Sequence, residues 1–327
     1  MTERNRALAA VSATMLFWGF SFVSIKIAVG VFGPMTLGAL RFFIAVVFLF
    51  FLKRVKAPEE KIKKEDIPLL AGAGLTGVTL YFFFENNGVA RVPASEASII
   101  TAAIPVITLI AETLGVNFSN RKKEDRDSKN SGNNRESLLK KILFPGLGAL
   151  VSMTGVGLVA GVSLALHGSA AGYLFLAGTC ASWVIYCFLT PPLFERHSRI
   201  FVVFWQSAIG FIGFLPFAIF EKNPPMLGLL MHGAGNVDLW VWGHVVFLGI
   251  FCSAIGYWFY ALALNELGVV SSSVFINFIP VISAIGGYFV LGERLRPLQI
   301  LGAILVLAGV YVAVAGPRFK RKRERRN

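Results

Sequence analysis

Ten apolar segments alternate with shorter polar segments along the chain. They span residues 7–29, 34–52, 67–88, 92–115, 142–161, 170–189, 200–220, 239–264, 269–291 and 297–315. Each is close to the ~20 residues that an α-helix needs to cross the hydrocarbon layer of a bilayer. A signal peptide is the alternative interpretation of 7–29, but this segment is long for a signal core and nine similar segments follow it. The pattern predicts an all-α integral membrane protein with ten transmembrane helices.

The tetrapeptide Ile-Pro-Val-Ile occurs twice, at 104–107 and 279–282, each time within an apolar segment. A proline removes a backbone hydrogen bond from a helix. Membrane helices tolerate it, because neighbouring helices and hydroxyl groups satisfy the freed carbonyl. Two helices broken by Pro105 and Pro280 at matching places of two halves indicate a binding site between the halves of a transporter.

Further matches align the two halves of the chain. Trp18 and Trp183 are separated by 165 residues, and so are Arg41 and Gln206. Five segments per half is an odd number, so the halves must cross the membrane in opposite directions, as in the inverted-topology repeats of secondary transporters. We therefore predict a 5+5 inverted repeat made of residues 1–161 and 162–327.

The first half carries a polar insertion at about 117–138, rich in Lys, Asp, Asn, Ser and Gly. Such a composition predicts a disordered cytoplasmic loop. In 142–161 and 297–315, pairs of glycines seven residues apart predict close helix packing, within one chain or between two copies in a homodimer. These glycines are Gly148 and Gly155, and Gly302 and Gly309.

Composition and charge agree with a membrane protein. The chain is 55% hydrophobic, with a mean hydropathy of +0.68 and a net charge of +13. The basic residues are concentrated in the gaps between apolar segments, which is typical of membrane topology and not of a nucleic-acid-binding surface. With the N-terminus inside, 25 Lys and Arg residues fall on the inner side and 4 on the outer side. This bias predicts a multi-pass protein of the plasma (inner) membrane with both termini cytoplasmic.

Several classes of function lack their sequence signals. The cysteines (Cys180, Cys187 and Cys252) lie within apolar segments without metal-ligand spacing, and the four histidines are scattered. We therefore predict neither a metal site nor another cofactor. The sequence lacks the GxxxxGK[ST] phosphate-binding motif, so transport driven directly by ATP hydrolysis is not expected. An intramembrane enzyme would need a base beside a nucleophile or a metal cluster, and a channel is more often an oligomer around a ring of filter residues. A carrier is favoured over both.

Motifs along the chain resemble the EamA-type branch of the drug/metabolite transporter superfamily. They are Trp18-Gly19-Phe20-Ser21-Phe22 with Lys26, Pro34, Arg41-Phe42, the two proline motifs, and Leu291-Gly292-Glu293-Arg294-Leu295. The resemblance implies a carrier of small metabolites, often an amino-acid exporter, with a cavity between the halves and with 142–161 and 297–315 at the periphery. The insertion at 117–138 is longer than the usual connection in this family.

Charged residues within the apolar segments all fall in the first half: Lys26, Arg41, Glu85, Glu96 and Glu112. Since a charge at the bilayer centre costs ~2.5–3.5 kcal/mol, such groups face protein or water. The first four share one level near the outer side, and we hypothesise that they form an outer gate. Snorkelling to water is the alternative for those nearest the helix ends. Glu85 and Glu96 are the candidates for a coupled proton.

The matching inner level of the second half is neutral, with Gln206, three serines at 271–273 and Asn277. It predicts a weaker inner closure. Aromatic side chains near these levels are able to stack on a substrate or surround a cation, although packing against lipid is the alternative for Trp and Tyr. The predicted cavity and gate residues are Trp18, Ser21, Phe22, Lys26, Arg41, Tyr81, Glu85, Glu96, Thr101, Trp183, Tyr186, Gln206, Tyr257 and Asn277, with Pro105 and Pro280 as helix breaks.

The sequence thus predicts a secondary-active or facilitative transporter that is not an enzyme and works by alternating access in the lipid bilayer. The resemblance makes an amino acid or related polar metabolite, exported from the cell, the first candidate substrate. A carrier for a cationic amine such as choline is the alternative, followed by a channel or an intramembrane enzyme. The substrate, its direction, a coupled proton and a homodimer are left open.

Overall fold

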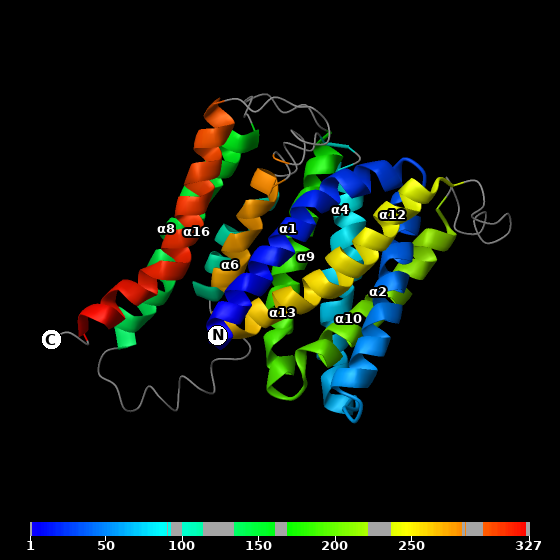
Figure 1. The fold of residues 1–327 in the computed structure, drawn as a ribbon, viewed down its shortest axis with the longest axis horizontal. Coiled ribbons are helices and arrows are strands. Elements are labelled where there is room, and N and C mark those ends of the chain that lie inside the picture. The colour runs from blue at the N-terminus through cyan, green and yellow to red at the C-terminus, as the bar shows by residue number, and fades with distance from the viewer. Residues whose placement is uncertain are drawn as a thin grey trace.

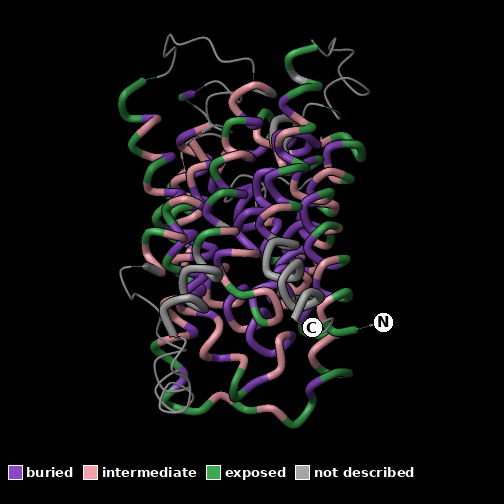
Figure 2. Tube along the Cα trace, turned by 90° about the vertical axis from the view of Figure 1, so that its left-hand side faces the viewer, coloured by how far each residue is buried: buried purple, intermediate pink, exposed green. Residues whose placement is uncertain are grey.

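The computed structural model describes residues 2–89, 91–92, 100–113, 134–160, 169–221, 237–282, 285 and 297–324. Within these ranges every regular element is a helix (Figure 1). The predicted all-α fold is therefore confirmed. Figure 2 shows that the buried residues concentrate in the middle of the bundle.

The elements of the first half are α1 (Glu3–Val29), α2 (Pro34–Lys56), η1 (Lys64–Asp66), α3 (Ile67–Gly74), η2 (Leu75–Leu80), α4 (Tyr81–Val89), α6 (Ile104–Thr113) and α8 (Asn134–Ala160). Those of the second half are α9 (Ala170–Leu189), η4 (Pro191–Glu195), α10 (Arg199–Ile219), α12 (Leu239–Phe247), η5 (Leu248–Ile255), α13 (Gly256–Leu267), α14 (Val269–Val274), η6 (Phe275–Asn277) and α16 (Pro297–Glu324). The elements η2 and η5 are π-helical, and each continues the α-helices on either side of it.

Helical segments of the described chain are long and apolar enough to cross a membrane at Pro34–Lys56, Lys64–Val89, Ala170–Glu195, Arg199–Ile219 and Leu239–Leu267. Shorter apolar helices occur at Gly146–Leu158, Val269–Ile282 and Ile300–Ala313. Large apolar side chains on these helices point outward, including Phe51 (64% exposed) and Leu174 (74% exposed). An apolar exterior of this kind suits lipid, because a bilayer provides no hydrophobic penalty for exposing it.

The most extensive helix packing joins the two halves of the chain. The main pairs are α1 with α13, α2 with α10, α4 with α9, and α8 with α16. The α8–α16 pair stands at one edge of the bundle in Figure 1, which agrees with the expected peripheral position of these helices.

Carboxylates tie α2 and α10 together at both ends. The Glu221 carboxylate, just after α10, accepts hydrogen bonds from the backbone N–H groups of Met35 (3.0 Å) and Thr36 (2.8 Å) in the first turn of α2. Conversely, the Glu60 carboxylate, in the chain after α2, accepts a bond from the Ser198 N–H (2.9 Å) just before α10. A helix N-terminus has unsatisfied N–H groups and a positive dipole end, so a carboxylate stabilises it.

The ends of some elements differ from the sequence prediction. α8 begins at Asn134, so the last residues of the loop predicted at 117–138 are helical, in keeping with the helix-forming run of Arg, Glu, Leu and Lys that follows Asn134. The rest of that loop lies outside the described residues. α16 continues to Glu324, well past the predicted end at 315, so part of the basic tail is helical.

Glycines allow α8 and α16 to pack backbone to backbone. A Cβ atom added at Gly309 would lie 2.5 Å from the Gly148 carbonyl oxygen, and one at Gly155 would lie 2.5 Å from the Gly302 carbonyl oxygen. We expect Gly309→Ala to lower the free energy of unfolding by ~1–3 kcal/mol, because the helices must move apart. Thermal unfolding in detergent measures the loss.

The matched control for this change is Gly243→Ala, because a Cβ atom there meets nothing within 4 Å. This variant should be at least as stable as the wild type, since alanine is the better helix former. Equal stability of Gly309→Ala and the wild type would contradict the close α8–α16 contact.

Candidate functional site

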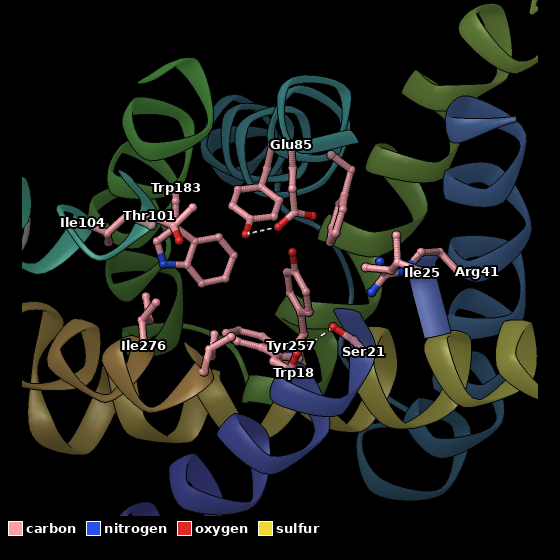
Figure 3. Close-up of a pocket in the computed structure, with 13 residues that line it drawn as sticks. Trp18, Ser21, Ile25, Arg41, Glu85, Thr101, Ile104, Trp183, Tyr257 and Ile276 are labelled. Atoms are coloured by element: carbon pink, nitrogen blue, oxygen red, sulfur yellow. Dashed lines mark hydrogen bonds between the residues drawn. The ribbon is translucent and has the colours of Figure 1, made fainter. Parts of the chain in front are cut away.

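A cavity lies in the middle of the bundle, between elements of both halves (Figure 3). It encloses about 560 Å³ of empty volume, its open part included. It is lined by Trp18, Ser21, Ile25, Arg41, Tyr81, Phe82, Glu85, Thr101, Ile104, Trp183, Tyr257, Ile276 and Ile279. Among the described residues, no group of three or more His, Cys, Asp or Glu side chains is arranged to hold a metal ion.

Arg41 provides the positive charge of the cavity wall. The residue is 4% exposed, and its guanidinium group points from α2 into the cavity (Figure 3). Nε donates a hydrogen bond to the Ser253 hydroxyl on η5 (2.8 Å). The guanidinium carbon lies 4.4 Å from the centre of the Phe82 ring, a cation–π contact. These contacts hold the guanidinium group in one orientation between α2 and η5.

Glu85 provides the negative charge on another wall. It is 8% exposed, and one carboxylate oxygen accepts a hydrogen bond from the Tyr81 hydroxyl (2.9 Å), one turn earlier on α4. No ion pair joins Glu85 directly to Arg41, although both line the cavity. Each of the two groups is therefore able to interact separately with a molecule bound in the cavity.

Aromatic rings form the apolar part of the site. The Trp18 ring centre lies 5.4 Å from that of Trp183, 5.8 Å from Tyr257 and 5.3 Å from Tyr260. Trp183 in turn lies 5.9 Å from Tyr257 and 5.3 Å from Tyr260. Rings at such distances stabilise one another. The cluster therefore offers a rigid apolar surface from both halves of the chain.

The two π-helical segments anchor this cluster by their carbonyl groups. Trp18 Nε1 donates to the Cys252 carbonyl in η5 (3.0 Å), and the Tyr257 hydroxyl donates to the Gly77 carbonyl in η2 (2.7 Å). A π-helical turn shifts the backbone hydrogen-bonding register, and such turns occur frequently at functional sites. Here each one receives a side chain from a facing helix.

The cavity brings together many of the residues that the sequence predicted. Those that line it are Trp18, Ser21, Arg41, Tyr81, Glu85, Thr101, Trp183 and Tyr257. The side chains of Phe22 and Lys26, and the whole of Glu96, lie outside the described part of the structure. The predicted outer gate of Lys26, Arg41, Glu85 and Glu96 therefore stays a prediction.

Other predicted residues do not line the cavity. Tyr186 is fully buried beside the aromatic cluster, 5.1 Å from Trp183 between ring centres. Gln206 donates to the Thr190 hydroxyl (3.0 Å), and Asn277 donates to the Ser152 hydroxyl on α8 (2.6 Å). These two amides connect neighbouring helices instead of facing the cavity.

The proline motifs contribute through residues that the sequence analysis did not select. α6 begins at Ile104, so Pro105 lies in its first turn, and Pro280 follows the 3-10 turn η6. Ile104 and Ile279, the first residues of the two tetrapeptides, both line the cavity. The repeated motif was therefore a usable signal for these residues. Ser253 and Phe82, the partners of Arg41, had no comparable signal.

An ionic network joins the two halves at the side that the charge pattern predicts to be cytoplasmic. Asp66 (0% exposed) pairs with Arg196 Nη1 (2.7 Å) and His197 Nε2 (2.8 Å). Glu60 lies 3.5 Å from His197 Nδ1, and Glu65 lies 3.5 Å from Arg196. These groups lie at the ends of the apolar segments and did not enter the prediction of a weaker inner closure, which stays a prediction.

An apolar-surfaced helical bundle with a buried, charged and aromatic cavity is typical of membrane proteins that bind a small molecule between their helices, among them transporters. The EamA-like transporter family model matches residues 5–121 and 170–315. The chain therefore belongs to the EamA-like transporter family, within the drug/metabolite transporter superfamily.

Relatives that are named as transporters, exporters or efflux pumps cover nearly the whole chain. An uncharacterized transporter of Archaeoglobus fulgidus is 28% identical, over 93% of this chain and 97% of its own. A probable terminal-alkyne amino-acid exporter of Streptantibioticus cattleyicolor is 25% identical (94% and 92%), and a probable amino-acid metabolite efflux pump of Escherichia coli is 25% identical (98% and 98%). A solved crystal structure with 18% identity has a TM-score of 0.70 over 95% of this chain and 97% of its own, and it supports the fold.

Proposed function

We propose that this protein exports an amino acid or a closely related zwitterion by alternating access. The observation that carries the proposal is that Arg41 and Glu85 both line one buried cavity without forming an ion pair with each other. A zwitterion complements both: its carboxylate binds the guanidinium group and its ammonium group binds the carboxylate. The side chain of the substrate then packs on the ring of Trp18 and its aromatic neighbours. The names of two relatives at 25% identity support amino-acid export.

Alternating access requires that the cavity open to one side at a time. The aromatic cluster and the Asp66 network close the inner side, and both must separate when the cavity opens inward. No bond in the substrate is made or broken in this cycle. Glu85 is positioned to carry a coupled proton, since a neutral Glu85 would bind the ammonium group more weakly and release it.

The proposed topology is ten transmembrane helices in a 5+5 inverted repeat, residues 1–161 and 162–327, in the plasma membrane with both termini cytoplasmic. Two reciprocal features of the halves support it. α1 packs on α13, and α9 packs on α4 in the same way. The start of α2 binds Glu221, which follows α10, and the start of α10 binds Glu60, which follows α2. The start of α1 and the end of α16 also lie toward the same end of the bundle in Figure 1. A homodimer through the exposed faces of α8 and α16 is part of the proposal.

A carrier for a cationic amine is the second candidate. The aromatic cluster of Trp18, Trp183 and Tyr257 beside the Glu85 carboxylate favours it, because quaternary ammonium groups bind between aromatic rings and acidic residues. Arg41 opposes it, since a buried guanidinium group repels a cation. Transport in proteoliposomes of amino acids, amines and nucleosides, with and without a pH gradient, separates the two candidates. Uptake of amines but not of amino acids would replace the first proposal by the second.

Glu85→Gln tests the ammonium site. Glutamine keeps an oxygen acceptor for the Tyr81 hydroxyl but loses the charge, so we expect KM for amino acids to rise ~10-fold. The matched control is Glu65→Gln, because Glu65 is exposed outside the cavity and should leave KM unchanged. An unchanged KM in Glu85→Gln would remove Glu85 from the binding site, and loss of the pH-gradient effect in this variant would assign it the coupled proton.

A further inference from the structure

Both proline motifs contribute side chains to the wall of the cavity. Ile104 and Ile279 are the first residues of the two tetrapeptides, and Thr101 and Ile276 each lie three residues earlier. All four line the cavity. Thr101 and Ile276 are 175 residues apart, as are Ile104 and Ile279, and the same offset separates the two motifs. The two halves therefore supply corresponding side chains to one wall.

This wall faces away from the positive charge and is hydrophobic. In Figure 3, Thr101, Ile104 and Ile276 lie on the opposite side of the cavity from Arg41. Both isoleucines are buried, and an isoleucine side chain has no group that forms a hydrogen bond with a ligand. The buried ring of Trp183 continues the hydrophobic surface on this side.

The indole and serine donors of the cavity wall are engaged within the protein. Trp18 Nε1 donates to the Cys252 carbonyl (3.0 Å), and the Ser21 hydroxyl donates to the Trp18 carbonyl (2.7 Å). Trp183 Nε1 is fully covered, and the Tyr260 hydroxyl stands within hydrogen-bonding range of it. A substrate side chain therefore finds no free N–H or O–H group on these three residues.

The tyrosine and threonine residues of the wall are engaged as well. The Tyr81 hydroxyl donates to the Glu85 carboxylate (2.9 Å), and the Tyr257 hydroxyl donates to the Gly77 carbonyl (2.7 Å). Thr101 also has a partner within the protein. Among the described residues that line the cavity, every neutral residue with a donor group thus already has a partner, and the charged groups are left for a bound molecule.

We infer that the cavity selects amino acids with an apolar side chain, and that Ile276 is a specificity-determining residue. This inference rests on the proposed function and deepens it by naming the substrate class. With its carboxylate at Arg41 and its ammonium group at Glu85, an amino acid directs its side chain toward the isoleucine wall. A side-chain carbonyl or hydroxyl group there gives up its hydrogen bonds to water and meets no free donor, which costs free energy. Leucine, methionine and phenylalanine are therefore preferred over asparagine, glutamine and serine.

Leucine and asparagine test this preference, because their side chains have the same number and branching of heavy atoms. In proteoliposomes the wild type should transport leucine with a kcat/KM ~10–100-fold above that for asparagine. Ile276→Thr places a hydroxyl group in the hydrophobic wall, and threonine is the residue that the first half carries at the matching position, Thr101. The ratio should fall ~3–10-fold in this variant, because the new hydroxyl group pairs with the side-chain amide of asparagine.

Ile276→Val is the matched control, because valine has nearly the shape of threonine and no hydroxyl group. It should keep the leucine-to-asparagine ratio of the wild type within about twofold. An equal fall of the ratio in both variants, or no fall in Ile276→Thr, would overturn the role of Ile276. A wild type that transports asparagine as well as leucine would overturn the apolar substrate class while leaving amino-acid transport intact. Failure of the wild type to transport any amino acid would instead overturn the proposed function.

Stabilisation by bound ligand provides a readout that is independent of transport. A ligand that binds the folded protein raises its midpoint of thermal unfolding. At equal concentrations in detergent, leucine should raise the midpoint of the wild type more than asparagine does. The two shifts should approach each other in Ile276→Thr and stay apart in Ile276→Val. Equal shifts by both amino acids in the wild type would contradict the selectivity, whatever the transport assay shows.

Discussion

Arg41→Gln is expected to reduce transport of amino acids at least ~10-fold without preventing membrane insertion. In the proposed complex, the guanidinium group makes charge-assisted hydrogen bonds to the substrate carboxylate, which are about twice as strong as neutral ones. Glutamine is able to preserve one hydrogen bond to Ser253, but it loses the charge and the cation–π contact with Phe82. Initial rates in proteoliposomes, normalised to reconstituted protein, measure the effect.

Two companion variants make the Arg41 result specific. Arg41→Lys keeps the charge without the planar fork, so it should fall between the wild type and Arg41→Gln. Arg54→Gln removes an exposed guanidinium group near the other end of the same helix and should transport like the wild type. Wild-type transport by Arg41→Gln would contradict both the outer-gate hypothesis and the proposed carboxylate site. Increased transport of choline by this variant would favour a cationic substrate.

Asp66→Ala is expected to destabilise the protein by ~2–3 kcal/mol, because it removes two hydrogen bonds to a buried carboxylate and leaves the buried His197 without its partner. Asp66 is fully buried and accepts from both Arg196 and His197, which belong to the other half of the chain. His197 would lose its 2.8 Å contact while still stacked on Phe201, 4.5 Å between ring centres. The midpoint of thermal unfolding in detergent should fall clearly below that of the wild type.

Glu65→Ala is the matched control for this second prediction. The neighbouring carboxylate also faces Arg196, at 3.5 Å, but its side chain is 62% exposed. Exposed ion pairs contribute ~0–1 kcal/mol, so this variant should unfold near the wild-type temperature. If both variants were equally stable, the network would be a solvated surface feature and not a connection between the halves. In that case the inner side would be closed by the aromatic cluster alone.

The all-helical fold and the apolar helices of the described chain were predictable from the sequence for a physical reason. A segment of ~20 apolar residues has few stable alternatives to a membrane-spanning helix, because every backbone polar group must be satisfied internally in lipid. Two of these helices begin directly after a serine that caps them. The Ser169 hydroxyl accepts from Gly172 N–H at the start of α9, and the Ser198 hydroxyl accepts from Phe201 N–H in α10.

The direction in which a polar side chain points was not predictable to the same degree. A membrane helix is apolar on most faces, so its sequence carries only a weak indication of which face meets protein. Arg41 and Gln206 occupy matching places in the repeat, yet Arg41 lines the cavity while Gln206 binds Thr190. Asn277 likewise faces Ser152 on α8. Only the packing of the helices distinguished these cases.

By itself, the sequence determined that the chain forms apolar helices, that it repeats a proline motif in each half, and that the charged residues within the apolar segments all fall in the first half of the chain. These properties depend on local composition and on the lipid environment. The tertiary structure alone decided that Arg41 contacts Phe82 and Ser253, that Asp66 contacts His197, and that Tyr257 donates to the Gly77 carbonyl. Such contacts join residues up to 212 positions apart, and their existence depends on the rotation and register of packed helices, which no local pattern encodes.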